Sequence, residues 1–344
     1  MTHYAGLDVS LEETAIAIVD ETGRTVREAK VASEIEAIDA WLRRSGLTIT
    51  RLGLEAGPLS SWLYAGLKAQ GWPVICIETR RLRAVTRAMP VKSDRKDAEA
   101  IAQVMRTGWY RAVHVKSLAS QQLRVLLRHR KLLQAKRQDL ENELRGTLKA
   151  FGLKLGQVGQ APFAQRLSEL VAGDPWLDRL ARPMLAARAA LMKSFAELHR
   201  LILKIVRADS VCQQLLTIPG IGAITALAYK TGIDDPTRFR HSADVGPHFG
   251  LTPRRYESGE TEYTGRISKC GDAMVRSLLF EAALALLHRV KAASALKRWA
   301  RRLAKKVGTR KAAVALARRL AVIMHRMWCD GTAFNPNLIR VAAN

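Results

Sequence analysis

The sequence predicts an α/β domain followed by two mostly helical regions. Three observations support this fold class. Residues 1–117 alternate strand-type and helix-type patterns, residues 118–210 repeat apolar residues at helical spacing, and residues 211–344 are mainly helical and basic. We therefore expect three domains divided at these boundaries.

The α/β domain begins with strands. The stretch YAGLDVSLEETAIAIVDETGRTVREAKVA holds two or three of them, with DETGR as a hairpin turn. EIEAIDAWLRRSG is a short amphipathic helix that ends at Gly46. Strand, helix and strand patterns follow in TRLGLEA, LSSWLYAGLKAQG and WPVICIET, and this order implies parallel pairing through a crossover. Ser93 is the expected N-cap of the last helix, SDRKDAEAIAQVMRTG.

The middle region carries two series of apolar residues at alternating spacings of three and four. The first series runs from Leu126 to Phe151 and the second from Leu177 to Ile205. Such spacing forms the seam of a coiled coil or of a long helical hairpin, and we expect this region to mediate self-association. Pro183 predicts that the second long helix begins near it.

The last region combines a glycine turn, a glycine-rich loop and basic helices. TIPGIGAITALAYKTGI has the apolar-Pro-Gly-apolar-Gly order of a helix-hairpin-helix motif, in which Gly220 and Gly222 permit tight backbone geometry beside a helix N-terminus. Such a motif grips the phosphate backbone, although an ordinary turn between packed helices would carry the same glycines. GLTPRRYESGETEYTGRISKCGD is expected as a loop, before the helix AMVRSLLFEAALALLHRV and a basic helical tail.

Composition restricts the class of partner. The 344 residues include 56 Lys and Arg against 31 Asp and Glu, a net charge of +25, which predicts a nucleic-acid partner. No apolar run approaches the ~20 residues of a bilayer span. The polar start MTHYAGLDVS is not a signal peptide. We therefore expect a cytoplasmic, nucleoid-associated protein with no membrane partner. The four cysteines and eight histidines are scattered without metal-ligand spacing.

Four carboxylates stand where the expected elements end or begin. Asp8 and Glu55 end strands, and Asp94 and Asp97 lie one turn apart at a helix start. Carboxylate oxygens in this arrangement could hold two Mg²⁺ (or Mn²⁺) ions, which stabilise the attacking and leaving oxygens at a phosphate. Each acid alone also has an ordinary interpretation, as a turn residue or as a favourable charge in the first turn of a helix.

The order strand-Asp, hairpin, strand-Glu, helix, strand and helix-DxxD resembles the RuvC-like, RNase H-type nuclease fold. The stretches LEAGPLSSWLY, KSDRKDAEAIA, TIPGIG and FGLTPRRYESGETEYTGRISKCGDAMVRSLL resemble the DEDD transposases of the IS-one-ten insertion-sequence family, relatives of the Piv-type invertases. The resemblance covers nearly the whole chain. Ser93, where Thr is commoner, and Cys270, where a polar residue is usual, depart from the pattern without touching a carboxylate.

The resemblance implies the remaining chemistry. Ser258 matches the family's serine nucleophile, which attacks a phosphodiester and holds the cut strand covalently. Spacing alone would make Ser258 a loop tip, and Ser268 is the competing serine. The resemblance further implies dimers joined into a tetramer around donor and target DNA, and guidance by a structured bridge RNA. It places the Mg²⁺ ions on Asp8, Glu55, Asp94 and Asp97.

Basic residues and glycines around these motifs are the expected contacts to nucleic acid. They are Lys92, Arg95, Lys96, Gly220, Gly222, Arg254, Arg255, Arg266 and Lys269.

These patterns together predict a site-specific DNA recombinase or transposase that uses metal-binding carboxylates and a serine. Two alternatives remain open. One is a metal-only, junction-resolving nuclease in which Ser258 is inert, and a covalent protein–DNA adduct would separate it from the first reading. The other is a non-catalytic nucleic-acid-binding protein that keeps the acids as remnants of its fold, and metal-dependent cleavage would exclude it.

Overall fold

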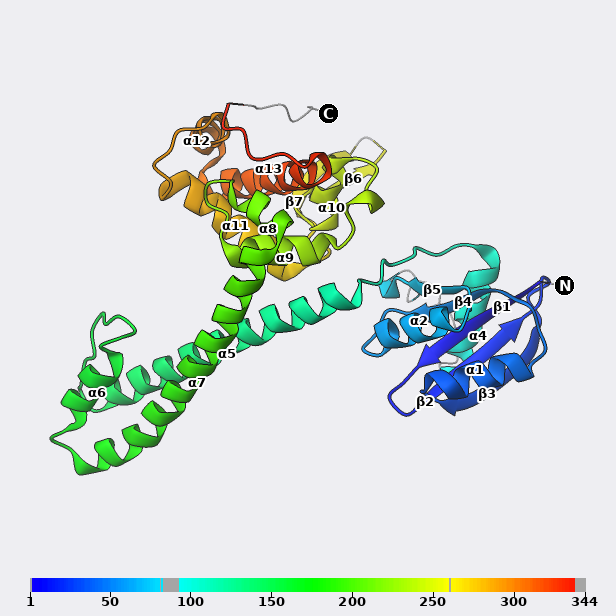
Figure 1. Ribbon diagram of the computed structural model, residues 1–344, viewed down its shortest axis with the longest axis horizontal. Coiled ribbons are helices and arrows are strands. Elements are labelled where there is room, and N and C mark those ends of the chain that lie inside the picture. The colour runs from blue at the N-terminus through cyan, green and yellow to red at the C-terminus, as the bar shows by residue number, and fades with distance from the viewer. Residues whose placement is uncertain (1, 81, 83–92, 260, 338–344) are drawn as a thin grey trace. The chain divides into compact units, whose positions relative to one another are not determined.

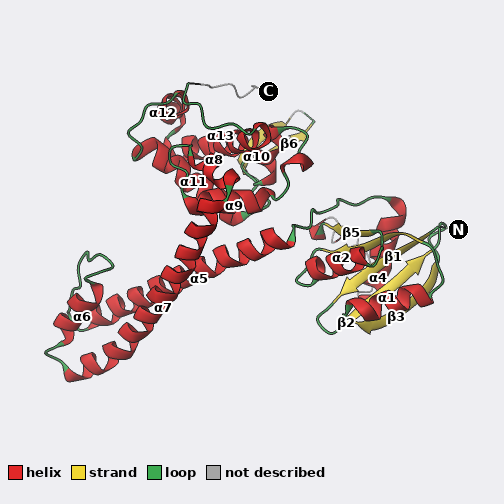
Figure 2. Ribbon diagram, viewed as in Figure 1, coloured by secondary structure: helices red, strands yellow, loops and turns green. Residues whose placement is uncertain are grey.

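The structure, a computed structural model, describes residues 2–80, 82, 93–259 and 261–337. The chain divides into two compact units, Met1–Lys116 and Ser117–Asn344 (Figure 1). Residues 118–210 and 211–344, expected as separate domains, fall within the second of these units. In Figure 2, strands occupy the first unit and one short ribbon of the second, and the rest of the secondary structure is helical.

A five-stranded mixed sheet forms the first unit, in the order β3-β2-β1-β4-β5. Its strands are β1 (His3–Val9), β2 (Glu13–Val19), β3 (Thr25–Ala32), β4 (Ile49–Glu55) and β5 (Val74–Ile77). The β1–β2 and β2–β3 pairs are antiparallel, whereas β1–β4 and β4–β5 are parallel. The described helices of this unit are α1 (Ile35–Arg44), α2 (Ser60–Ala69) and α4 (Asp94–Thr107). The arrangement confirms the expected α/β class and crossover, and it is consistent with an RNase H-like domain.

The two faces of this sheet bury residues of different size. Large aliphatic side chains such as Ile16 and Leu54 pack with α1 and α2 in one apolar core. On the other face, Ala15 and Ala17 pack against Ala98 of α4. A Cβ atom added to Gly6 would lie 2.2 Å from the carbonyl oxygen of Ala98. The small residues therefore let α4 lie directly on the strands, because successive side chains of a strand point to opposite faces.

A long helical hairpin opens the second unit. It consists of α5 (Leu118–Ala150) and α7 (Pro175–Ala208), with α6 (Phe163–Val171) between them in sequence. Arg188 Nε donates to Glu141 Oε1 at 2.7 Å and Arg130 Nε donates to His199 Nδ1 at 3.2 Å, so the two long helices run antiparallel. Leucines from both helices pack with α6 in one apolar core. The apolar series thus contact each other within the chain, while coiled-coil geometry and self-association stay predictions.

The expected start of the second long helix near Pro183 is wrong. The helix α7 begins at Pro175, and Pro183 lies inside it. Asp174 caps the helix because its Oδ1 accepts hydrogen bonds from the backbone N–H groups of Trp176 and Leu177. Proline is also favourable at the first helical position, where its missing N–H has no partner to lose.

A helical core follows. It is formed from α8 (Ser210–Leu216), α9 (Ala223–Ile233), α10 (Val245–His248), α11 (Ala273–His288), α12 (Ala295–Val307) and α13 (Thr309–Asp330). Tyr229 and Phe249 are buried at its centre, and the Tyr229 hydroxyl donates to the carbonyl oxygen of Ala321 at 2.6 Å. None of the described helices is long and apolar enough to cross a bilayer.

The glycine-rich stretch after α10 is not a simple loop. It forms an antiparallel ribbon of two strands, β6 (Pro253–Ser258) and β7 (Thr261–Ile267). Tyr256 lies on one side of Gly259, and Thr261, Tyr263 and Thr264 lie on the other; tyrosine and threonine favour strands, and here they outweigh the glycines. The expectation of a loop is therefore corrected to a β-hairpin.

Candidate functional site

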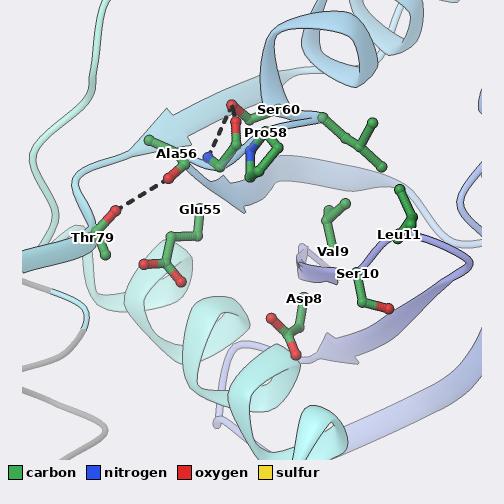
Figure 3. Close-up of a pocket in the computed structure, with 11 residues that line it drawn as sticks. Asp8, Val9, Ser10, Leu11, Glu55, Ala56, Pro58, Ser60 and Thr79 are labelled. Carbon is green, nitrogen blue, oxygen red and sulfur yellow. Dashed lines mark hydrogen bonds between the residues drawn. The ribbon is translucent and has the colours of Figure 1, made fainter. Parts of the chain in front are cut away.

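Two of the predicted acids lie side by side at the ends of neighbouring strands. Leu7 of β1 pairs with Leu54 of β4 in the parallel ladder, and the next residues are Asp8 and Glu55. Asp8 shares a sheet face with Gly6, two residues earlier, and Glu55 shares the same face with Gly53. This is the face on which α4 packs, and Figure 3 shows both carboxylates on that side of the strands.

Helix α4 brings its first turn toward the same strand ends. Ile101 lies against both Gly6 and Gly53, while Met105, one turn later, lies against Gly53 alone. Arg51, near the start of β4, donates to the carbonyl oxygen of Met105 at 2.8 Å. The helix therefore runs opposite to β1 and β4, so its N-terminal turn lies toward their carboxyl ends.

That first turn carries Asp94 and Asp97. The hydroxyl of Ser93 accepts a hydrogen bond from the backbone N–H of Lys96 at 3.3 Å, which confirms Ser93 as the N-cap. Asp97 stands one turn before Ile101 and is half-buried, whereas the side chain of Asp94 is 62% exposed. Within the first turn of α4, Asp97 is therefore the less exposed acid and Asp94 the more exposed one.

A pocket of about 390 Å³ opens at the strand ends. Its lining includes Asp8 and Glu55, together with the residues that follow each strand (Figure 3). The hydroxyl of Thr79 donates to the carbonyl oxygen of Ala56 at 3.2 Å, and Ser60 donates to the carbonyl oxygen of Gly57 at 2.7 Å. These bonds restrain the loop after Glu55, so side-chain hydroxyl groups hold the backbone of this pocket wall in place.

Lys30 is part of the same arrangement, although sequence reasoning did not identify it. Asp8 pairs with Ala15 of β2, and Ala15 pairs with Lys30 of β3, so Lys30 and Asp8 lie in one row across the sheet. Lys30 Nζ lies 2.7 Å from Asp94 Oδ2. This hydrogen bond lowers the pKa of the Asp94 carboxyl and raises the pKa of Lys30.

The donor set suits a hard cation, since carboxylate oxygens are the ligands that Mg²⁺ and Mn²⁺ prefer. Within residues 2–80, 82, 93–259 and 261–337, however, no three or more Asp, Glu, His or Cys side chains lie together as a metal-binding group. Asp94 is paired with Lys30, and neither Asp94 nor Asp97 is among the residues that line the pocket. The structure therefore brings Asp8 and Glu55 to one pocket and leaves Asp94 paired beside it.

The basic residues beside the acids take part in ion pairs. Arg95 pairs with Glu28 of β3, and Lys96 Nζ lies 2.7 Å from Glu99 Oε2. Both pairs are partly exposed, where such interactions add little to stability. Lys92, the third predicted phosphate contact here, lies outside the described residues.

The predicted nucleophile lies at the end of the β6–β7 ribbon. Ser258 pairs with Thr261 across the turn, and Gly259 follows Ser258 with φ of 56°. Every residue of β6 is exposed. A serine hydroxyl placed there is open to a macromolecular substrate.

Ser268 has a different environment. Its backbone N–H donates to the carbonyl oxygen of Thr252, and its hydroxyl accepts a hydrogen bond from the N–H of Cys270 at 3.4 Å. Its carbonyl oxygen accepts a hydrogen bond from Arg254. Ser268 is half-buried, and its hydrogen bonds stabilise the turn after β7. Exposure therefore favours Ser258 as the reactive serine.

The other predicted nucleic-acid contacts are spread over the second unit. Arg254, Arg255, Arg266 and Lys269 are all exposed. Arg255 lies 3.3 Å from Glu257 and 3.4 Å from Glu262, so part of its charge is offset within the ribbon.

The two glycines of the expected helix-hairpin-helix motif have different roles. Gly220 has φ of 95°, and a Cβ atom there would lie 3.0 Å from the carbonyl oxygen of Ala282 in α11. Gly222 is the N-cap of α9 and faces open space. Gly220 is thus required for packing, while binding of phosphate at Gly222 stays a prediction.

Comparison with known proteins supports the order of these motifs. A family model described as transposase, for the DEDD transposases of the IS110 type, matches residues 5–152. A second model, for transposases of the IS116/IS110/IS902 family, matches residues 212–300. The first match contains the four acids and the second contains Ser258.

Individual relatives extend over both matches. The transposase for insertion sequence element IS1111A of Coxiella burnetii is 29% identical over 328 residues, covering 93% of this chain and 87% of the relative. A probable family 20 transposase of Pseudomonas aeruginosa is 33% identical over 71% of this chain and 74% of its own length. The transposase for IS1328 of Yersinia enterocolitica is 30% identical with the same coverages.

Proposed function

This chain belongs to the IS116/IS110/IS902 family of DEDD transposases, enzymes that act on DNA, and on that premise we propose that it cuts and rejoins DNA strands at specific sites with Asp8, Glu55, Asp94, Asp97 and Ser258. One observation carries the proposal. Asp8 and Glu55 lie side by side over one pocket, at the strand ends toward which α4 turns its DxxD sequence. Asp8 and Glu55 are two carboxylates at one pocket, and a bound cation would offset the repulsion between them, as Lys30 offsets the charge of Asp94.

The family implies a divalent metal, and Mg²⁺ or Mn²⁺ fits the oxygen donors. Asp8 and Glu55 would hold it from the sheet, with Asp97 and Asp94 contributing from the helix once Asp94 leaves Lys30. A bound ion would supply Lewis-acid stabilisation of charge on the phosphate oxygens. The protein contributes the fixed strand ends, which hold Asp8 and Glu55 in one orientation before substrate arrives.

Ser258 would carry the covalent step. Its hydroxyl oxygen attacks the phosphorus, the bond from phosphorus to the leaving sugar oxygen breaks, and that oxygen gains a proton while the serine loses its own. The phosphoserine ester conserves the energy of the phosphodiester bond, so rejoining by the reverse attack requires no nucleotide hydrolysis. Glu257 and Glu262 are engaged with Arg255, and we assign neither as the base.

A denaturing assay tests the covalent step. Purified protein is incubated with Mg²⁺ and end-labelled DNA that carries the complete insertion sequence, and label that migrates with denatured protein is measured. We expect Ser258→Ala to abolish the adduct and Ser268→Ala to retain it. Label that persists in Ser258→Ala and disappears in Ser268→Ala would transfer the role to Ser268. Efficient cleavage without any wild-type adduct would instead favour the metal-only, junction-resolving nuclease.

We also propose a guide RNA as a partner beside donor and target DNA. The net charge is +25, and no Asp or Glu occurs between Glu281 and Asp330 in the sequence of the basic C-terminal helices. Such a surface binds phosphates of either nucleic acid. RNA that copurifies with the protein, and that maps to the noncoding DNA beside the gene, would support the proposal. Purified protein that recombines DNA at full rate after ribonuclease treatment would contradict it.

A homo-oligomer, with dimers joined into a tetramer, is proposed for the α5–α7 hairpin. Leu132, Leu180 and Leu201 remain 45–54% exposed on these helices after the hairpin has formed. Sedimentation of the full chain should show a dimer or larger species. Aspartate substitutions at these three leucines should lower the mass, and a monomeric wild type at working concentration would overturn this assignment.

A further inference from the structure

The β6–β7 ribbon exposes two aromatic rings beside Ser258. Tyr256 and Tyr263 face each other across the strands, with ring centroids 5.4 Å apart and an angle of 31° between the rings. Their exposed fractions are 52% and 59%. Tyrosines in contact with each other usually lie against a larger apolar surface, so a ring pair left this exposed on a charged ribbon is a candidate contact surface.

The tyrosine pair and Ser258 share one face of the ribbon. Tyr256 pairs with Tyr263 and Ser258 pairs with Thr261, and these two pairs are separated by a single intervening pair. Residues two apart on a strand point to the same side and are separated by roughly 7 Å along it. Glu257 and Glu262 form the intervening pair and therefore point to the opposite face, where Arg255 contacts both.

Arg254 precedes the tyrosine pair on β6, on the side away from Ser258 along the strand. A Cβ atom at Gly265 of β7 would lie 3.7 Å from the Arg254 carbonyl oxygen, 3.9 Å from the Tyr263 ring and 4.0 Å from Arg254 Cβ, which are ordinary contact distances. Arg254 and Tyr263 therefore both lie next to Gly265. The guanidinium group of Arg254 donates a hydrogen bond to the carbonyl oxygen of Ser268 at 3.3 Å, so this face of the ribbon is defined by the pair of aromatic rings and the hydroxyl group of Ser258.

An exposed pair of rings next to a hydroxyl group matches the chemistry of a nucleic-acid strand, in which flat bases alternate with phosphates. Aromatic side chains stack on unpaired bases of any sequence, and a neighbouring arginine adds contact to phosphate. We propose that Tyr256 and Tyr263 form a stacking platform for an unpaired DNA base next to the phosphate that Ser258 attacks. The inference rests on the proposed role of Ser258. It adds Tyr256 and Tyr263 as residues that position the substrate for Ser258.

The platform explains how an exposed ribbon could position a scissile phosphate. A ribbon of two strands is only marginally stable, and it has few groups that can hold a substrate rigidly. A stacked base would fix its own nucleotide relative to Ser258, because both groups project from the same face. Stacking requires the base to leave the duplex, so the platform selects a strand that is unpaired at the cut.

Cross-strand stabilisation of the ribbon is the alternative role for the tyrosines. The double variant Tyr256→Ile/Tyr263→Ile keeps β propensity and apolar contact across the strands but removes the flat rings. Tyr256→Phe/Tyr263→Phe keeps the rings and removes only the hydroxyls. Trp176→Leu is the matched control, because Trp176 is 61% exposed on α7, away from the ribbon sequence.

The first measurement uses full-length protein and a single-stranded oligodeoxynucleotide containing 5-iododeoxyuridine. Irradiation joins this base to an aromatic ring on which it stacks, and mass spectrometry identifies the peptide. We expect crosslinks at Tyr256 or Tyr263 and none at Trp176. Absence of crosslinks at both tyrosines would overturn the proposal even if every variant failed to fold.

The second measurement compares affinity for the same oligonucleotide with the rate of the covalent adduct. The isoleucine pair should weaken binding by about tenfold to a hundredfold, from the usual effect of losing a stacked base, and slow the adduct. The phenylalanine pair and Trp176→Leu should behave as wild type. Equal loss in the phenylalanine pair, or full activity in the isoleucine pair with intact folding, would overturn the proposal.

The two proposals fail separately. Crosslinks at the tyrosines without any wild-type adduct would retain the platform and remove Ser258 as nucleophile. A wild-type adduct whose rate does not respond to the isoleucine pair would retain Ser258 and remove the platform. Crosslinks to an oligoribonucleotide but not to the DNA probe would assign the ribbon to RNA and contradict the proposal.

Discussion

The acid-bearing sheet and the serine-bearing ribbon are built in opposite ways. Asp8 and Glu55 extend from a five-stranded sheet whose two faces are covered, and Gly6 lies so close to α4 that no Cβ atom would fit. Ser258 extends from two strands in which all side chains of β6 are exposed. Rigid acids and an accessible serine suit different tasks, because a metal site requires fixed ligands and a nucleophile must reach a large substrate.

The largest expected effect is loss of an acid in the sheet. Asp8→Ala and Glu55→Ala should each lower recombination by at least about a hundredfold, because a metal ligand contributes several kcal/mol to charge stabilisation at phosphate. DNA affinity should change little, since the basic surface remains. Glu12→Ala is the control, because Glu12 is an exposed acid in the β1–β2 turn. Near-normal recombination by Asp8→Ala would contradict the proposed role of the acids as metal ligands.

The next largest effect should come from adding one methyl group, which should destabilise the sheet more than the ribbon. Gly6→Ala should destabilise the first unit by roughly 1–3 kcal/mol, because overpacking forces neighbouring atoms to move, here the backbone of α4. Gly265→Ala in the ribbon should have a much smaller effect, since its nearest contact would be at 3.7 Å. Urea unfolding and hydrogen exchange in α4 provide the measurements. Equal stability of Gly6→Ala and wild type would contradict the close packing of helix and sheet.

A smaller effect is expected at the ion pair beside the acids. Lys30→Met should raise the affinity for Mg²⁺ or Mn²⁺ severalfold, because Asp94 no longer has a protein cation at 2.7 Å. Titration of metal against thermal unfolding measures this without requiring activity. Lys96→Met is the control, since Lys96 pairs with Glu99 and not with a proposed ligand. Unchanged or weaker metal affinity in Lys30→Met would show that Lys30 does not compete with metal.

The smallest effect concerns pH. His325 is buried, its Nε2 lies 3.1 Å from the Pro236 carbonyl oxygen and must donate, and its Nδ1 accepts from the Ser242 hydroxyl at 2.9 Å. Burial lowers the pKa of His325 below its ordinary value near 6.5. The unfolded chain therefore binds the proton first, and stability of the second unit should fall as pH drops below about 6.5, by at most roughly 1.4 kcal/mol per pH unit.

The first unit should respond in a lower pH range. Lys30 lowers the pKa of Asp94, so the contribution of this pair is present above the ordinary pKa of aspartate and is lost only as pH falls through the lowered value. Hydrogen exchange in each unit between pH 7 and 5 should therefore show the loss of stability expected from His325 in the second unit, and no loss from the Asp94–Lys30 pair in the first. His325→Gln should reduce this slope, and His288→Gln, an exposed position, should not. An unaltered slope in His325→Gln would assign the effect elsewhere.

Much of the first unit and its acids could be predicted from the sequence. The strands and helices around Asp8 and Glu55 follow from local patterns. Ser93 caps its helix because its hydroxyl accepts a hydrogen bond from the backbone N–H three residues later. Asp8 and Glu55 each end an expected strand, and the resemblance to the RNase H-type fold implies one metal site for both, so these two acids were expected to meet. These inferences depend on short sequence separations and on topology, both of which the sequence contains.

Tertiary structure decided the features that depend on register and on distant packing. Lys30 reaches Asp94 only because β2 and β3 pair in one register, and a shift of one residue would turn Lys30 to the other face. Gly220 is required by α11, 62 residues away at Ala282, which no local pattern records. Tyr256 and Tyr263 form a pair only once the stretch around Gly259 becomes a ribbon. The sequence by itself predicted which residues would carry the proposed chemistry, whereas the pairing of strands and the packing of helices decided which of them contact one another, because those contacts join positions that the chain keeps far apart.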